Sequence, residues 1–152
     1  MKAFVDTSAF YAMASETDQA HVTARAVHEQ LKRDNTPLVT TNYILLETVS
    51  LLQRRHGVAY AERFGDSVIE EVELIWMTLT QHRAAWKLWK ERRNRGLSLV
   101  DCSSFVVMRE LHMPHAFAFD EQFQEAGFIL LDHPGDRVAE RRGVYRTGRA
   151  RR

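Results

Sequence analysis

The chain has 152 residues, which suits one domain and leaves little room for a second. Hydrophobic residues make up 45% of it and charged residues 27%, the balance of an ordinary globular domain. The single cysteine, Cys102, excludes an intramolecular disulfide framework, and no apolar run approaches the ~18 residues of a membrane span. No signal-peptide pattern precedes the first strand-like segment, so we expect a cytoplasmic protein without a membrane partner.

Strand-like and helix-like segments alternate along the chain. In chain order they are a strand at 3–5, a short helix capped by Ser8, a helix at 19–32, a strand at 38–40, a helix at 43–56 capped by Asn42, a helix at 58–72, a strand at 74–77, a helix at 80–95, a helix at 98–111, a strand at 116–119, a short helix at 120–126 and a strand at 129–131. The strand segments are continuously apolar, as in a sheet covered by helices on both faces. The pattern predicts an α/β fold with a mostly parallel sheet.

The net charge of +1 is distributed unevenly. Residues 133–152 hold seven arginines against two acids, a net charge of +5, whereas residues 1–132 hold 14 basic and 18 acidic side chains, a net charge of −4. The end of the chain also has almost no apolar residues. We therefore predict a folded domain over 1–132 and a basic, disordered tail over 133–152. The tail either contacts phosphates or an acidic partner, or only aids solubility, and the sequence leaves both interpretations open.

Two acids follow predicted strands, Asp6 after the first and Asp120 after the fourth. Ligands of open parallel sheets bind outside the carboxyl ends of the strands, so both acids are candidate site residues. Aspartate is also a preferred helix N-cap, and for either residue taken alone this second interpretation is the stronger one.

Glu47 lies on an apolar stripe of its predicted helix, beside Tyr43, Ile44 and Leu51. No lysine or arginine stands three or four residues away, so a buried charge here needs another partner. A bound metal ion is one solution, and a solvated position at the edge of the sheet is the other.

Asp101 stands three residues after Ser98, which matches a capping box at the start of a helix. Such boxes occur in many proteins without a site, but the same helix start also points a carboxylate into a cleft. Taken together, the four acids offer only oxygen ligands, which favour Mg²⁺ or Mn²⁺. No histidine or cysteine spacing typical of zinc is present.

Four segments, in this order, resemble the PIN-domain family, and specifically the VapC-type toxins of bacterial toxin–antitoxin pairs. They are Phe4-Val5-Asp6-Thr7-Ser8, Thr41-Asn42-Tyr43-Ile44-Leu45-Leu46-Glu47, Gly96-Leu97-Ser98-Leu99-Val100-Asp101, and Phe117-Ala118-Phe119-Asp120-Glu121-Gln122-Phe123 followed by Gly127. The resemblance covers residues 3 to about 131 and leaves out the arginine-rich tail. It implies a three-layer α/β/α sandwich with a five-stranded, mostly parallel sheet.

The resemblance also implies an endoribonuclease that depends on Mg²⁺ or Mn²⁺. The acidic positions of the family fall on Asp6, Glu47, Asp101 and Asp120. Asp6 and Asp101 would hold the principal metal with help from Asp120, and Glu47 would bind a second metal or orient the attacking water. The catalytic hydroxyl position falls on Thr7 or Ser8, and strand alternation favours Ser8. Glu121 could replace its neighbour as the fourth acid. An antitoxin partner and a homodimer are further implications.

The helix predicted at 80–95 carries side chains that suit an RNA substrate. Its candidate RNA-binding residues are Arg83, Lys87, Lys90, Arg92, Arg93 and Arg95. These could follow phosphates, and Trp86 or Trp89 could stack on a base. The alternative is that the two tryptophans, three residues apart, form the core face of the helix.

Other functions are open from the sequence. One is a PIN-like RNA-processing nuclease without an antitoxin, and another is a catalytically inactive RNA-binding or scaffold module. A phosphatase with an aspartate nucleophile expects a second aspartate two residues after the first, where Ser8 stands. A receiver domain expects a late lysine, and no lysine follows Lys90.

Overall fold

A computed structural model of the chain describes residues 1–136. Its elements are β1 (Ala3–Val5), α1 (Thr7–Ala14), α2 (His21–Arg33), β2 (Leu38–Thr41), α3 (Asn42–His56), α4 (Val58–Glu71), β3 (Glu73–Ile75), α5 (Leu79–Arg92), α6 (Leu99–Glu110), β4 (His115–Phe117), α7 (Gln122–Glu125) and β5 (Ile129–Leu130). Among the described residues, no helix has the length and apolar character needed to cross a bilayer.

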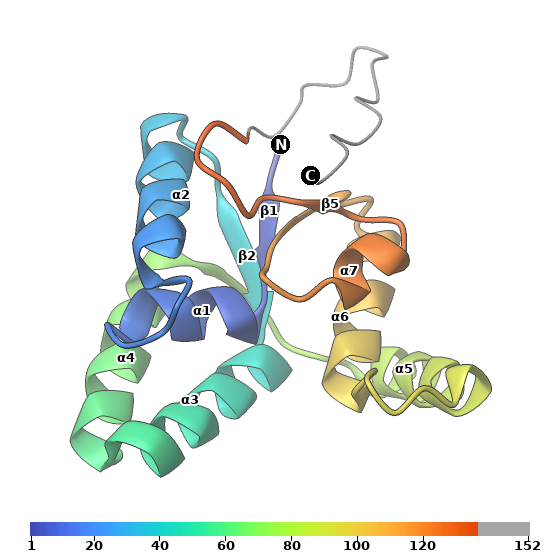
Figure 1. The fold of residues 1–152 in the computed structure, drawn as a ribbon. Coiled ribbons are helices and arrows are strands. Elements are labelled where there is room, and N and C mark those ends of the chain that lie inside the picture. The colour runs from blue at the N-terminus through green and yellow to red at the C-terminus, as the bar shows by residue number, and fades with distance from the viewer. Residues whose placement is uncertain (137–152) are drawn as a thin grey trace.

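The five strands form one parallel sheet in the order β3-β2-β1-β4-β5. The central strand β1 aligns Phe4 with Val39 of β2 on one side and with Ala116 of β4 on the other. Helices α1 to α4 lie on one side of the sheet, and α5, α6 and α7 lie on the other (Figure 1). The predicted three-layer α/β/α sandwich with a five-stranded sheet is therefore confirmed.

The core explains why the strands read as unbroken apolar runs. Every residue of β1 and of β4 is buried, and Phe4 and Phe117 are fully enclosed between the two helix layers. Because the strands are parallel, the chain leaves β1, β2 and β4 at the same edge of the sheet. That edge is where the predicted acids gather.

Two predicted caps are wrong by one or two residues. Asp6, not Ser8, is the N-cap of α1, and its side chain accepts from the Ser8 backbone N–H. Thr41, not Asn42, caps α3 and accepts from the Ile44 backbone N–H. In both places the last extended residue of a strand carries the oxygen and the helix begins directly after it, so no loop residue is needed as a cap.

Two predicted boundaries around α5 also differ. The third strand ends at Ile75, and the next residue, Trp76, is 73% exposed rather than part of the sheet. Helix α5 ends at Arg92 because Arg93 adopts the left-handed conformation, with a φ of 47°. The prediction had placed this helix end at Gly96, on the assumption that a glycine terminates it.

Candidate active site

Asp6 lies where β1 passes directly into α1, and it is only 4% exposed. One of its oxygens, Oδ2, accepts hydrogen bonds from the Ser8 backbone N–H at 3.0 Å and from the Ser8 hydroxyl at 2.6 Å. Burial raises the pKa of Asp6 to about 7 although these hydrogen bonds oppose the shift, and the charges of Asp101 and Glu47 raise it further. The Asp6 carboxyl group is thus buried and is close enough to other acids for their negative charges to act on it.

Ser8 connects Asp6 to the segment that follows β4. Its Oγ donates to Asp6 and accepts from the Phe119 backbone N–H at 2.9 Å, across 111 residues of sequence. Thr7 turns the other way, since Thr48 donates to its Oγ1 at 3.2 Å inside the protein. The hydroxyl beside the carboxylate is that of Ser8, but strand alternation is the wrong reason, because the helix has already begun at Thr7.

Asp101 occupies the first turn of α6 and is 8% exposed. The predicted capping box is confirmed: Ser98 Oγ accepts from the Asp101 backbone N–H at 3.0 Å, and Asp101 Oδ2 accepts from the Ser98 backbone N–H at 3.0 Å. Burial raises the pKa of Asp101 to about 6, opposed by the bonds with Ser98 and assisted by the charges of Asp120 and Glu47. Asp101 therefore caps its helix and also lies close enough to Asp120 and Glu47 for their charges to act on it.

The other two acids, Glu47 and Asp120, are half-buried at the rim of the same site. Glu47 projects from α3 and its charge acts on both Asp6 and Asp101. Within residues 1–136 no ion pair is recorded for it. Asp120 Oδ1 accepts from the Gln122 backbone N–H at 2.9 Å, which holds the carboxylate before α7. Its neighbour Glu121 is exposed.

The structure thus brings the four predicted acids close enough for their charges to act on one another. Among the described residues, however, no three of the four have ligand atoms that all lie within 4.8 Å of one another. The carboxylate oxygens of the four acids are therefore spread apart and leave room for water ligands. Such a set fits Mg²⁺, which keeps several water ligands and takes one or two carboxylates directly. Two buried acids with raised pKa values also fit a site that gains stability from a cation.

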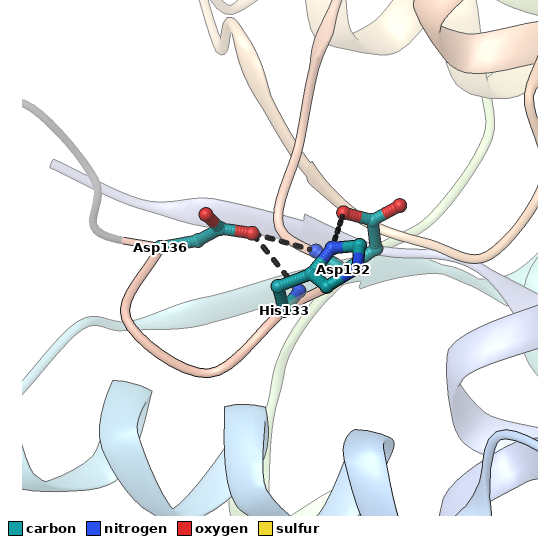
Figure 2. A network of polar contacts seen from close by, with 3 residues as sticks. All are labelled: Asp132, His133 and Asp136. Atoms are coloured by element: carbon teal, nitrogen blue, oxygen red, sulfur yellow. Dashed lines mark hydrogen bonds and ion pairs between the residues drawn. The ribbon is translucent and has the colours of Figure 1, made fainter. Parts of the chain in front are cut away.

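One tighter group lies elsewhere, directly after β5, and Figure 2 shows it. It contains Asp132, His133 and Asp136, whose ligand atoms do lie within 4.8 Å of one another. Asp136 Oδ2 accepts from the backbone N–H groups of Asp132 and His133, and His133 Nδ1 lies 2.7 Å from Asp132 Oδ1. Nothing in the spacing of Asp132, His133 and Asp136 along the sequence is typical of a metal site. Its hydrogen bonds within a turn account for the geometry without a metal ion.

The same turn reaches the predicted boundary between domain and tail. Gly135 N–H donates to Gln30 Oε1 of α2 at 2.8 Å, so residues just after 132 contact the domain. The rest of the predicted tail, residues 137–152, lies outside the described residues.

The six predicted RNA-binding side chains on and after α5 are all exposed. Trp86 and Trp89 are exposed by 44% and 37%, so the interpretation that they form the core face of the helix is wrong. Ala85 is the only buried residue of α5, and Leu88 is partly buried against the same core. Helix α5 packs against α6. The sequence carries no signal for this, because the tryptophan spacing fits either face.

Comparisons with known proteins place most of the chain beside proteins of one family. The model of the PIN domain family matches residues 3–129. The chain is 36% identical over 130 residues to the 23S rRNA-specific endonuclease VapC20 of Mycobacterium tuberculosis, in each of two strains, which covers 83% of this chain and 95% of the relative. The crystal structure of the same relative, described as a sarcin–ricin loop cleaving toxin, aligns with a TM-score of 0.74 at 33% identity, covering 84% of this chain and 97% of the relative.

Proposed function

The chain belongs to the PIN domain family, and on that premise we propose that it is an endoribonuclease toxin of a toxin–antitoxin pair whose substrate is 23S rRNA. The class of activity predicted from the sequence, a metal-dependent ribonuclease, agrees with the family and with the relatives. The observation that carries the proposal is the shared field of four acids, Asp6, Glu47, Asp101 and Asp120, at the carboxyl edge of the sheet. Buried like charges destabilise a fold that binds no cation, so they are not expected in an inactive scaffold.

We assign these four acids to a site for Mg²⁺ or Mn²⁺, which would take one or two of the carboxylates directly and the others through bound water. When bound, the cation supplies a water of lowered pKa and offsets the negative charge that builds on the phosphate. Ser8 orients the Asp6 carboxylate through its hydroxyl, and the capping box orients Asp101. Glu47 would bind a second metal or orient the attacking water.

The six exposed basic residues of the α5 region would contact the phosphates of the substrate. A cytoplasmic location, an antitoxin that covers the site and a homodimer complete the proposal. The similarity to a VapC toxin supports the antitoxin. The same similarity favours a toxin over an RNA-processing nuclease without an antitoxin.

The test is cleavage of 23S rRNA, free and in ribosomes, with ends mapped by primer extension. We expect cuts in Mg²⁺ or Mn²⁺, none in EDTA, and a loss of at least about a hundredfold in Asp101→Asn, in line with the removal of one transition-state contact. Asp66→Asn, which changes an exposed acid of α4, is the matched control and should cut like the wild type. Undiminished cleavage by Asp101→Asn would contradict the assignment of the site. Cleavage in EDTA would contradict a metal-dependent mechanism.

A further inference from the structure

The C-terminal end of α5 carries a hollow, and its lining includes three of the basic residues proposed above to contact phosphates. It has a volume of about 330 Å³, near the lower end of small-molecule sites. Its lining consists of Trp89, Lys90, Arg93, Asn94 and Arg95. One aromatic ring among three cations is a composition that suits a nucleotide.

The aromatic part of this hollow is half of an exposed pair. The rings of Trp86 and Trp89 have their centroids 5.1 Å apart at an interplanar angle of 38°. Both rings are partly exposed to solvent. An exposed indole at a basic surface is the platform on which single-stranded nucleic acids stack their bases, because every base has a π face.

The cations of the hollow are available to a ligand. Lys90, Arg93 and Arg95 are exposed, and no ion pair is recorded for any of them within residues 1–136. Lys87, one turn earlier, differs because Glu91 lies 3.9 Å away on the same helix. Three cations without acidic partners beside an aromatic ring complement a polyanion.

Arg93 holds its position at a cost to the backbone. Its φ of 47° places it in the left-handed region, and its N–H donates to the Trp89 carbonyl at 3.2 Å to close the helix. Glycine is the usual residue at such helix ends because it has no Cβ to clash. Asn35 and His112 adopt the same conformation after α2 and α6, so what distinguishes Arg93 is its place in the lining of the hollow.

The chain length between Arg95 and Asp101 limits how far the hollow can lie from the acids. Arg95 is six residues before Asp101, so their Cα atoms are at most about 20 Å apart. The turn between them is compact, since Asn94 Oδ1 accepts from the Gly96 N–H and the Asn94 carbonyl accepts from the Leu97 N–H. A strand of RNA lying across the acids can therefore reach the hollow within a few nucleotides.

From these observations we propose that the hollow at the end of α5 binds one unpaired base of the RNA substrate, with Trp89 stacked on the base and Lys90, Arg93 and Arg95 on the adjoining phosphates. This rests on the ribonuclease function proposed above and adds to it a specificity site. The substrate must then present an unstacked base a few nucleotides from the cut, as a loop does and a regular duplex does not.

The test compares Trp89→Ala and Arg93→Gly with Trp76→Ala, which removes an exposed tryptophan outside the hollow. Binding is measured in EDTA, so that no RNA is cut, by fluorescence anisotropy of a labelled 12-nucleotide single-stranded RNA. We expect Trp89→Ala to raise the Kd on the order of tenfold, the effect of losing one stacked base. Arg93→Gly should reduce the slope of log Kd against log salt by about 0.7, the value for one lost phosphate contact.

Arg93→Gly also separates binding from folding, because glycine relaxes the left-handed position and should leave the melting temperature equal or higher. In cleavage of 23S rRNA, Trp89→Ala should raise KM more than it lowers kcat. Equal Kd and KM values for Trp89→Ala and Trp76→Ala would overturn the proposal. A change in the oligomeric state of Trp89→Ala without a change in RNA binding would also overturn it, because the surface would then be a contact between copies of the chain. If the wild type cuts no RNA but Trp89→Ala still weakens RNA binding, the base-binding role of the hollow is supported and the proposed ribonuclease activity is contradicted.

Discussion

Asp6 combines two roles that sequence reasoning treats as alternatives, since it caps α1 and also lies buried among the acids of the site. The two roles use different properties of the side chain. A cap needs only an oxygen that accepts from the backbone, whereas a metal ligand needs a negative charge. Substitutions can therefore separate them.

We expect Asp6→Asn to keep the fold and lose the activity. Asparagine caps as well as aspartate and removes a buried charge, so the free energy of unfolding should stay the same or increase. Asp6→Ala should lose the activity and also about 1 kcal/mol of cap stabilisation. Urea unfolding in EDTA and cleavage rates in Mg²⁺ measure the two effects. A strongly destabilised Asp6→Asn would mean that the charge itself supports the fold.

The raised pKa values of Asp6 and Asp101 predict how stability depends on pH without metal. Both groups ionise at lower pH in the unfolded chain, where the usual value is 3.8, than in the folded protein, at about 7 and about 6. Between these values the folded state holds more protons, so its stability is greatest at low pH and falls as pH rises towards 7. Each group contributes a slope of up to about 1.4 kcal/mol per pH unit.

Urea unfolding in EDTA between pH 4.5 and 8 measures this slope. The double variant Asp6→Asn/Asp101→Asn is the matched control, because neither amide titrates, and it should be flatter than the wild type over the same range. Equal slopes for the two proteins would contradict the assignment.

At the scale of elements, helices α5 and α6 both begin with a capping box, but only one of the two boxes is part of the site. Thr78 and Gln81 form a capping box at the start of α5, and Ser98 and Asp101 form one at the start of α6. Only the second includes an acid of the site. The α6 box therefore fixes the helix start and the direction of a carboxylate with one set of hydrogen bonds.

We expect Thr78→Ala and Ser98→Ala to lose similar stability, about 1 kcal/mol each, because each removes one capping oxygen. Only Ser98→Ala should weaken Mg²⁺ binding and cleavage, since it frees the first turn that carries Asp101. Thermal unfolding and Mg²⁺ titration of both variants make the comparison. If both variants cleave RNA equally, the capping box has no part in positioning Asp101.

At the scale of the whole molecule, the site joins segments from both helix layers. Asp6 and Glu47 come from the side of α1 and α3, whereas Asp101 and Asp120 come from the side of α6 and α7 (Figure 1). A cation held by both groups joins the two sides, so its binding free energy stabilises the entire domain. Ion binding and folding are linked in such an arrangement.

We therefore expect Mg²⁺ to raise the melting temperature of the wild type, with a gain of about 2.7 kcal/mol when its concentration is a hundred times the Kd. The gain should increase between pH 6 and 8, as the two buried acids ionise, and should vanish in Asp6→Asn/Asp101→Asn. Differential scanning fluorimetry in EDTA and in Mg²⁺ measures it. An equal gain in the double variant would place the bound ion elsewhere, for example at the group after β5.

Local sequence was enough to predict much of this protein. The alternation of strands and helices, the acids that follow β1 and β4 and the Ser98 box are all read from residues close together in the chain. Such features depend on hydrophobic periodicity and capping, which act over a few residues. The α/β class and the proposed carboxylate chemistry follow from them, and the resemblance of four ordered segments added the family.

Contacts between segments far apart in the sequence decided which hydroxyl lies beside the acids and which side chains of α5 are exposed. The bond from Phe119 N–H to Ser8 Oγ spans 111 residues, and it singles out Ser8 rather than Thr7 as the hydroxyl beside the acids. The exposure of Trp86 and Trp89 depends on which face of α5 meets α6, and their spacing along the helix is the same in either case. The four acids were predictable from the sequence because their positions in the elements are local, whereas their partners and the surface around them required the assembled fold.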